Sequence, residues 1–575
     1  MGCRFGTALW TAFLCAPISA APSPPTFAHD IAPILYQSCA PCHHTGGPAP
    51  FPLIRYEDVK RHAAQIAAVT SKHYMPPFLP EAGHGDFADE RRLTPEQIRQ
   101  IGDWAAANAP EGPPTAIPAP PQFPDGWQLG PPDLILQAGS SVQVTASGPD
   151  LFWNFIFTPA LPSPRYVRAI EIRPGNRSVV HHANLLVDRS GTAQRAASRG
   201  SKGFPGMDLT VVRSPYDPDG HFLYWKPGAV PHVEPDGFSW RLNPSDVLVL
   251  NTHLHPSGKP EQERPSVGIY FTSKPPAHFP LLLQLEHDTA LRIPAGASDF
   301  VVSDDFTLPM DVDVLAVYPH AHYLGKLLEA YATLPDGSRK WLVRIPDWDL
   351  NWQSVFYYRE PLPLPKGAVL SMRYHYDNSA ANIRNPHQPP RPVTNGNQST
   401  DEMGHLWLEV LPRGPADRRV EFQEALMRHR LEKYPEDPSA YFNLGALALA
   451  RLNISAAVPL LENAVRLDPG SAEAHNMLGA ALARVGRVPE AIEQLRLALK
   501  QRPDFVNARL NLANALLRAG KLEEAVADYR QVLAAAPDDE TVRGAVETRA
   551  HQLEMEGRKA ESEMLYRELN AAPHH

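Results

Sequence analysis

The sequence predicts a multidomain protein that combines a small α-helical domain, a two-lobed antiparallel β-sandwich of jelly-roll type and an all-α solenoid. Three observations lead to this fold class. The length of 575 residues exceeds what one hydrophobic core usually serves, and the 62 prolines help to locate boundaries between domains. Short β-branched runs fill the middle of the chain, and a 34-residue period marks its last third.

Residues 1–21 have the form of a secretory signal peptide. The segment MGCRFGTALWTAFLCAPISAA contains one Arg, then an apolar run, and then small residues that would form a cleavage site near Ala20 or Ala21. We therefore expect a mature protein that is periplasmic or secreted. No later stretch approaches the roughly 20 apolar residues that a membrane span needs, so we expect no membrane span.

The charge of the chain argues against one class of partner. The formal net charge is −9 at pH 7, and the sequence contains no long basic run. Because nucleic-acid binding depends on clustered Lys and Arg, we do not expect a nucleic acid as partner.

The cysteines predict a covalently attached haem. Of the 4 cysteines, only Cys39 and Cys42 follow the leader, and both lie in the motif CAPCH. In an exported protein, C-x-x-C-His is typical of c-type haem attachment, with His43 as the proximal iron ligand. A short-loop disulfide is the alternative, and it would leave the His directly after Cys42 unexplained.

The haem motif lies in a small helical domain that we expect over residues 26–110. FAHDIAPILYQ reads as a helix leading into the motif, and LTPEQIRQIGDWAAANAPEG as a closing helix with Thr94 as N-cap and Pro95 in its first turn. The Pro-rich stretch over residues 111–125 reads as a spacer.

Met75, in HYMPPF, is the expected sixth ligand of the haem iron. This segment resembles the small cytochrome c modules found beside oxidases, in which a Met in a Met-Pro-Pro context holds that position. A thioether there raises the haem potential and suits electron transfer. Two histidines are alternatives for the same position, His73 and His84.

The middle of the chain reads as strands. VLVLNTHLH, SVGIYF, VDVLAVY and VLSMRYHY are short β-branched or aromatic runs bounded by Pro, Gly, Asn and Asp, a pattern typical of antiparallel sandwiches. We expect an N-terminal lobe over residues 126–279 and a C-terminal lobe over residues 280–412.

Histidine and methionine motifs in these lobes predict two copper sites. Imidazole suits copper in both oxidation states, and a thioether favours Cu(I). The motifs are VVHHANLL, LVLNTHLHPSG, VYPHAHYLGK and STDEMGHL, and their ligand candidates are His181, His182, His253, His320, His322 and Met403. A site with three His ligands and a second site with two His ligands and a Met would suit a pair of copper ions that cycles through Cu(I). We expect the ligands at strand ends, facing between two sheets.

The four motifs resemble those of the copper type II, ascorbate-dependent monooxygenases, the family of peptidylglycine α-hydroxylating monooxygenase and dopamine β-monooxygenase. The resemblance covers about residues 126–412 and keeps the family's order of motifs. It implies an electron-transferring copper on one ligand set: His181, His182 and His253. It also implies catalysis at a second copper, where dioxygen is activated, on the other set: His320, His322 and Met403.

The third ligand of the first copper has an alternative. His253 and His255 are two residues apart on a predicted strand and would point to the same face, so periodicity does not choose between them. The family motif selects His253.

The substrate is expected to be a small organic molecule other than peptidylglycine. The peptide enzymes carry an Arg two residues before their His-X-His motif, where it grips a carboxylate, and this chain has Tyr318 there. The aromatic side chains of Tyr318, Tyr323 and Trp407 would line a more apolar pocket, with ordinary packing in the sandwich core as the alternative.

The expected enzyme is a copper-dependent monooxygenase that hydroxylates a C–H bond of its substrate with O₂. Ascorbate is the reductant of the family, whereas here a haem fused to the same chain could relay electrons from a donor protein. The alternative is a non-catalytic haem and copper redox protein, or a copper sensor, that docks partners through its repeats.

The last third of the chain predicts tetratricopeptide repeats over residues 415–573. Prolines and small residues recur every 34 residues, at Pro435, Pro469, Pro503 and Pro537, and at Ala457, Ala491 and Ala525. A period of this length with these positions is typical of tetratricopeptide units, each of two antiparallel helices. Such a superhelix usually presents a protein-binding surface, so we expect a protein partner there.

Overall fold

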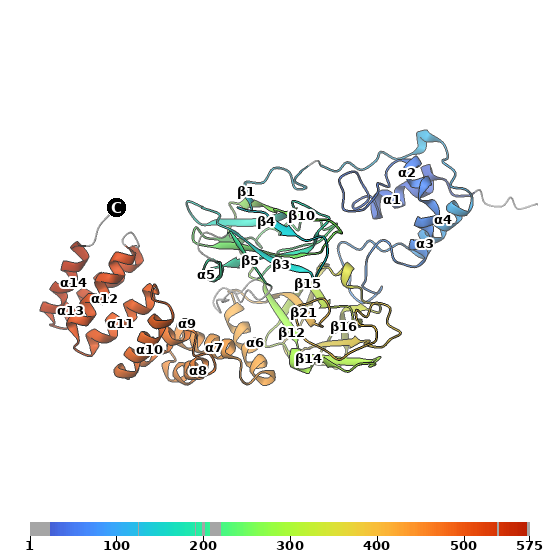
Figure 1. Cartoon of the computed structure of the whole chain (residues 1–575). Coiled ribbons are helices and arrows are strands. Elements are labelled where there is room, and N and C mark those ends of the chain that lie inside the picture. Colours follow the sequence, from blue (N-terminus) through green and yellow to red (C-terminus); the bar gives the residue numbers. More distant parts are fainter. Residues whose placement is uncertain are drawn as a thin grey trace, which may run out of the picture. The chain divides into compact units, whose positions relative to one another are not determined.

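The computed structural model describes residues 24–124, 126–189, 191–197, 202–206, 220–536 and 540–571. The expected signal peptide, residues 1–21, lies outside these ranges. The chain forms two compact units, which Figure 1 shows as ribbons. The first unit contains residues up to Phe78 and Glu90–Gly130, and the second contains Leu79–Asp89 and the chain from Pro131 onward.

The first unit is a small helical domain around the CAPCH motif. Its helical elements are η1 (Phe27–Ile31), α1 (Ala32–Ser38), α2 (Tyr56–Arg61), α3 (Ala63–Ser71), α4 (Pro95–Ala106) and η2 (Pro114–Ala116). The side chains of Phe27, Leu35 and Trp104 are fully buried in its core. Thr94 caps α4 as predicted, and Gln97 completes a capping box, so α4 begins where the sequence indicated.

Segment Leu79–Asp89 belongs to the second unit, although the expected haem domain, residues 26–110, included it. Glu81 forms an ion pair with Arg344. Phe87 is buried and packs its ring 5.1 Å from that of Tyr358. These contacts join residues more than 250 positions apart, which local sequence patterns do not reveal.

The N-terminal lobe consists of antiparallel sheets. Its strands are β1 (Leu134–Gln137), β2 (Val142–Val144), β3 (Leu151–Phe157), β4 (Arg165–Arg173), β5 (Val180–Asp188), β6 (Gly203–Pro205), β7 (Tyr224–Trp225), β8 (Trp240–Leu242), β9 (Val247–Leu254), β10 (Glu261–Glu263) and β11 (Ser266–Thr272), with one short helix, α5 (Thr192–Ala196). The two main sheets have the orders β1-β11-β4-β8 and β6-β3-β9-β5-β7. Their buried Val, Leu, Ile and Phe side chains form one core.

The C-terminal lobe repeats this arrangement. Its strands are β12 (Leu281–Glu286), β13 (Arg292–Ile293), β14 (Phe300–Thr307), β15 (Val312–Ala321), β16 (Gly325–Thr333), β17 (Arg339–Ile345), β18 (Phe356–Leu364), β19 (Val369–Tyr376), β20 (Val393–Thr394) and β21 (Gly404–Pro412), with the short helices η3 (Asp288–Ala290) and η4 (Leu350–Trp352). The main sheets have the orders β12-β21-β15-β18 and β14-β19-β16-β17. The predicted β-rich region is therefore confirmed.

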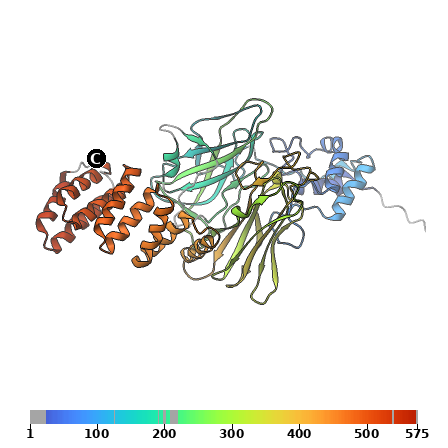
Figure 2. The same ribbon diagram turned by 60° about the horizontal axis from the view of Figure 1, so that its bottom comes forward.

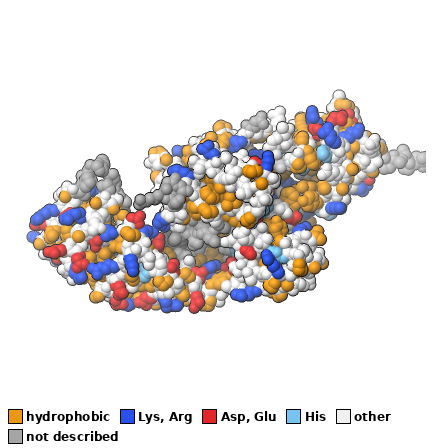
Figure 3. Space-filling view, viewed as in Figure 1, with side chains coloured by type: hydrophobic (Ala, Val, Ile, Leu, Met, Phe, Trp, Pro, Cys, Tyr) orange, Lys and Arg blue, Asp and Glu red, His pale blue; other side chains and the backbone are white. Residues whose placement is uncertain are grey.

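The last third of the chain is helical. The helices are α6 (Arg419–Lys433), α7 (Pro438–Ala450), α8 (Ile454–Leu467), α9 (Ala472–Arg484), α10 (Val488–Gln501), α11 (Val506–Arg518), α12 (Leu522–Ala535), α13 (Glu540–Met555) and α14 (Lys559–Ala571). From α7 onward they form successive antiparallel pairs, as Figure 2 shows. Basic and acidic side chains are interspersed over this region in the view of Figure 3. Among the described residues, no helix combines the length and the apolar character needed to cross a bilayer.

Helix α6 connects the repeats to the C-terminal lobe. Arg430 donates a hydrogen bond to Glu286 of β12 at 2.9 Å, and Lys433 donates to Asp304 of β14 at 2.6 Å. Both carboxylates are buried, with 4% and 5% of their surface exposed. Because buried charges are stable only when paired, this network specifies how α6 lies on the lobe.

We expect Gly479→Ala to destabilise the repeats by about 1–2 kcal/mol. A Cβ at this position in α9 would lie 2.6 Å from Cγ of Leu495 and 3.1 Å from the carbonyl oxygen of Ala491, so α10 would have to move. Gly544→Ala in α13 is the matched control, because a Cβ there meets nothing within 4 Å and alanine favours a helix by up to about 1 kcal/mol. Urea unfolding measures both; equal effects would contradict the close helix crossing.

Candidate metal centres

The first histidine set is assembled by a β-bulge in β5. The pairing register between β5 and β9 shifts between Val180 and His182, so His181 is an extra residue opposite the partner strand. Side chains of adjacent strand residues normally point to opposite faces, and a bulge removes that alternation. His181 and His182 can therefore both approach His253, which is paired with His182 across the strands.

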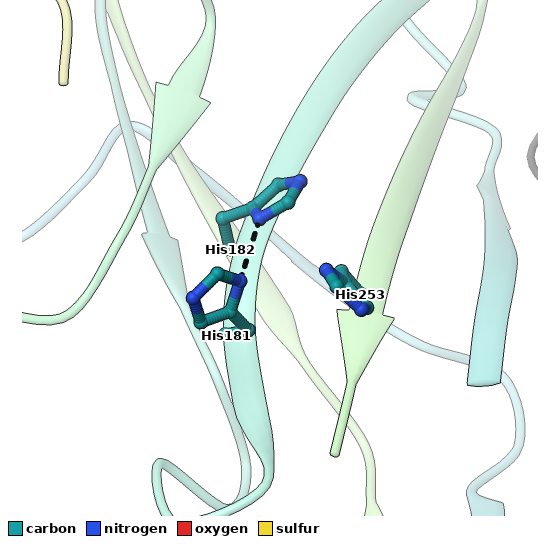
Figure 4. A group of neighbouring side chains, drawn as sticks. All are labelled: His181, His182 and His253. Atoms are coloured by element: carbon teal, nitrogen blue, oxygen red, sulfur yellow. Dashed lines mark hydrogen bonds between the residues drawn. The ribbon is translucent and has the colours of Figure 1, made fainter. Parts of the chain in front are cut away.

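The three imidazoles have the spacing of a ligand set. One ring nitrogen of each of His181, His182 and His253 lies within 4.8 Å of the other two. Figure 4 shows the two neighbouring rings of β5, whose Nδ1 atoms are 3.1 Å apart, and His253 across from them on β9. Nδ1 of His253 is buried and has no hydrogen-bond partner among the described residues. An imidazole nitrogen left in this state is suited to a metal ion.

Asp150 orients the histidines of β9 and was missed by sequence reasoning. One carboxylate oxygen lies 2.9 Å from Nε2 of His253, and the other lies 2.7 Å from Nδ1 of His255. A carboxylate on the far nitrogen of a ligating His sets its tautomer and raises its basicity. His255 lies within reach of Asp150 and His253 but does not join His181 and His182 in one close nitrogen set, so the geometry favours His253.

Burial keeps these histidines neutral. Burial, reinforced by His253, lowers the pKa of His181 to about 3. Burial also holds the pKa of His182 well below its usual value. Because only neutral imidazole offers a lone pair, both rings are in the form that binds metal at neutral pH.

The second set comes from the C-terminal lobe. The rings of His320 and His322, two residues apart at the end of β15, lie 5.2 Å apart and nearly perpendicular. Nδ1 of His320 is 2.7 Å from Oε1 of Gln353, and Nδ1 of His322 is 3.3 Å from the carbonyl oxygen of Asp401. An imidazole that donates from Nδ1 carries its lone pair on Nε2, the atom that could then bind a metal ion. Burial lowers the pKa of His322 to about 4.

Met403 is held next to this pair by Glu402, a second residue that sequence reasoning missed. The buried Glu402 carboxylate accepts hydrogen bonds from the backbone N–H groups of Met403, at 2.8 Å, His322, and Leu324, at 2.9 Å. The hydroxyl of Tyr376 donates to the carbonyl oxygen of Met403 at 2.9 Å. Glu402 therefore ties the chain segments of two candidate ligands together. The signal in the sequence was an acidic residue directly before Met403.

Gln353 stands between the two sets. Its Oε1 accepts from the hydroxyl of Tyr318, at 2.8 Å, as well as from His320, and its Nε2 lies 3.4 Å from Nδ1 of His182. The Gln353 amide therefore contacts His182 on β5 of the N-terminal lobe and His320 on β15 of the C-terminal lobe. No local pattern marks Gln353, because its partners come from distant parts of the chain.

Both sets border one cavity of about 790 Å³ that is lined by residues of both lobes. His182, His320 and Met403 line it, and so do Tyr318 and Trp407. The sequence predicted ligands at strand ends facing between two sheets, and these three residues border a space lined by residues of both lobes. We call this space the interlobe cavity. Tyr323 does not line it.

The CAPCH motif directly follows α1 in the first unit. Cys39 and Cys42 are free thiols, and neither forms a disulfide. Nδ1 of His43 lies 2.9 Å from the carbonyl oxygen of Phe51, so it donates and leaves Nε2 free. His62, which the sequence did not single out, stacks on Phe51 at 3.9 Å.

The structure distinguishes the three candidates for the sixth ligand of the haem iron by the unit in which each lies and by its exposure. Met75 is half-buried in the first unit, and its N–H donates to the carbonyl oxygen of Val69 at 3.3 Å. His73 is exposed with a positive φ of 54°. His84 belongs to the second unit, where its ring meets Trp341 at 4.7 Å. Met75 and His73 therefore share a unit with CAPCH, and His84 does not.

Comparison with known proteins identifies the helical region. The tetratricopeptide repeat family matches residues 442–504 and 477–540. The last third of the chain contains tetratricopeptide repeats, as predicted. A comparison with curated proteins finds no match.

Solved structures similar to the chain include repeat proteins. MamA is 20% identical, over 26% of this chain and 85% of that chain, with a TM-score of 0.23. YrrB, described as a TPR protein with an unusual peptide-binding site, is 21% identical, over 27% of this chain and 79% of that chain, with a TM-score of 0.23. These similarities add nothing to the family match.

Proposed function

We propose that the β-rich region is a copper-dependent monooxygenase that hydroxylates a C–H bond of a small organic substrate with O₂. The observation that carries this proposal is that His182 of one candidate set and His320 and Met403 of the other, which come from different lobes, line one cavity. His181, His182 and His253 would hold one copper, and His320, His322 and Met403 the other. Bound copper would supply one-electron redox chemistry and the activation of dioxygen.

The protein's own residues would orient the ligands and exclude water. Asp150, Gln353 and Glu402 hold the ligand rings and the Met403 segment through the hydrogen bonds described above. Tyr318 and Trp407 give the interlobe cavity an aromatic lining that suits an apolar substrate. Three protein ligands at the second set would leave a coordination position for a small molecule, as catalytic metal sites require.

The test is a comparison of metal content and turnover. Protein purified from a host that matures c-type cytochromes should contain two coppers per chain, and it should consume oxygen only with a substrate that becomes hydroxylated. The panel of small molecules should be broad, because the residues that line the cavity do not single out one substrate. A protein that exchanges electrons but never turns over would favour the alternative below.

The tetratricopeptide repeats support a second candidate function. A repeat superhelix offers a surface for a protein partner, and about a third of this chain is devoted to it. In that case the chain would be a non-catalytic haem and copper redox protein, or a copper sensor, that docks partners through the repeats. Removing copper should then change partner binding, which a pull-down with and without a copper chelator measures.

One covalent haem per chain is expected in the first unit. Cys39 and Cys42 would bond to the porphyrin, His43 would bind the iron through its free Nε2, and Met75 would be the sixth ligand. Acid–acetone extraction should leave the colour on the polypeptide, because thioether bonds survive it. Pigment that extracts freely would contradict the assignment. The leader, residues 1–21, supports a periplasmic or secreted location, where such haems are attached.

We further propose that this haem relays electrons to the first copper. The Pro-rich spacer over residues 111–125 keeps the haem unit on the same chain, and tethering gives roughly millimolar local concentrations. Haem reduced anaerobically should therefore reoxidise in copper-loaded protein at a rate independent of protein concentration. His253→Ala should slow this step and leave haem reduction unchanged. A rate that scales with protein concentration would favour ascorbate or another soluble donor.

A further inference from the structure

A third cluster of metal-ligand side chains lies where the two lobes meet, and its His221 also lines the interlobe cavity. It consists of His221, Glu234 and Glu409. His221 precedes β7 and Glu234 follows it, and the backbone N–H of Glu234 bonds to the carbonyl oxygen of Arg168 on β4 at 2.8 Å. Glu409 comes from β21 of the C-terminal lobe, opposite Ala316 of β15. Each lobe therefore contributes to the cluster.

The spacing of the donor atoms matches one coordination sphere. Nδ1 of His221 lies 3.0 Å from Oε1 of Glu234 and 3.8 Å from Oε1 of Glu409. Ligand atoms about 2.1 Å from a tetrahedral metal ion are roughly 3.4 Å from one another, between the two observed distances. A small ion would therefore need little rearrangement of these three side chains.

The cluster is buried and incompletely satisfied. The side chains of His221, Glu234 and Glu409 expose only 8%, 9% and 4% of their surface. Nδ1 of His221 is buried and has no hydrogen-bond partner among the described residues, although Oε1 of Glu234 lies 3.0 Å from it. Two buried carboxyl groups and one imidazole thus lie close together, and a divalent cation could bind all three.

We propose that His221, Glu234 and Glu409 bind a divalent transition-metal ion of the Zn²⁺ class that joins the two lobes. Imidazole with carboxylates suits Zn²⁺, and the cluster lacks the thioether that favours Cu(I). His232 stacks on Tyr357 at 3.9 Å, and its Nε2 lies 3.7 Å from the other oxygen of Glu234.

The position of Glu409 gives the ion a structural role. Met403 directly precedes β21, and Glu409 lies six residues beyond it, about 20 Å along an extended chain. An ion at Glu409 is therefore too distant to share a ligand set with Met403. It would instead hold β21 against the N-terminal lobe and keep the walls of the interlobe cavity in place. This role does not depend on the proposed monooxygenase activity.

The test counts Zn²⁺ on the full-length protein after its copper sites are saturated. The purified chain is stripped with a chelator, reloaded with copper, exposed to Zn²⁺ and desalted, and both metals are measured by plasma mass spectrometry. We expect one Zn²⁺ per chain and a rise of several degrees in Tm. Glu409→Gln and His221→Ala should each lose the Zn²⁺ and the rise in Tm while their copper content stays unchanged.

The control is Glu171→Gln, which changes another buried carboxylate, on β4, and should retain the Zn²⁺. Copper-saturated wild-type protein that takes up no Zn²⁺ would overturn the proposal. Zn²⁺ retained by both cluster variants would also overturn it, because the ion would then lie elsewhere. Wild-type protein that binds the Zn²⁺ but hydroxylates no substrate would count against the monooxygenase proposal alone.

Discussion

Met403→Ile is expected to abolish oxygen-dependent hydroxylation and to remove one of two copper ions. Ile has nearly the same volume as Met, so this buried position stays filled, but it offers no sulfur to Cu(I). The histidines of β5 and β9 are untouched, and their copper should still give its electron paramagnetic resonance signal. Turnover should fall by a factor of roughly 100 or more, as expected when an essential catalytic interaction is lost.

Met372→Ile provides the matched control for this experiment. Met372 is fully buried in β19 and is not among the candidate ligands, so its replacement should alter stability but not copper content. A Met403→Ile protein with two coppers, or with full activity, would refute the two-site mechanism. Equal copper loss in both variants would mean that the effect comes from packing.

Glu402→Ala is expected to destabilise the C-terminal lobe by at least about 3 kcal/mol. Three backbone N–H groups, of Met403, His322 and Leu324, would lose their acceptor in a fully buried place. Each unsatisfied buried donor costs about 1–3 kcal/mol. Because two of these groups belong to candidate ligand residues, copper at the second set should also bind more weakly. Urea unfolding and a copper titration measure the two effects.

Two further variants separate these causes. Glu402→Gln keeps one acceptor oxygen and should lose less stability than Glu402→Ala. Glu360→Ala removes an exposed carboxylate from β18 and should change stability by less than about 0.5 kcal/mol. If Glu402→Ala were no worse than Glu360→Ala, the carboxylate would not hold the Met403 segment.

Local patterns were sufficient for several parts of the fold. The 34-residue period predicted the repeats, because each unit is two helices whose contacts are mostly with their neighbours. Gly445 and Gly479 occupy places where a Cβ would lie 2.7 Å and 2.6 Å from a Leu Cγ, which explains why small residues recur there. Thr94 as N-cap and Pro95 in the first turn predicted the start of α4 for the same reason, since a cap involves only a few neighbouring residues.

The candidate copper site could be predicted only in part. The motifs marked the histidines, and the structure brings His181, His182 and His253 together as expected. The bulge that allows two adjacent histidines to share a site was not predictable, because it depends on pairing between β5 and β9. Asp150 and Gln353 were missed for the same reason, since each acts on a histidine more than 30 residues away.

The sequence by itself determined the kinds of structure along the chain and the residues with metal-binding chemistry. Helix periodicity, strand alternation, helix caps and the CAPCH motif each involve residues that are close together in the chain, so the sequence alone reveals them. Only the tertiary structure decided which candidate ligands of the two lobes lie on a common cavity. It also decided that Leu79–Asp89 packs with the β-rich unit and that the side chains of His221, Glu234 and Glu409 lie close together. The physical reason is that burial and charge pairing join residues far apart in the chain, and such contacts form only when the sheets are packed.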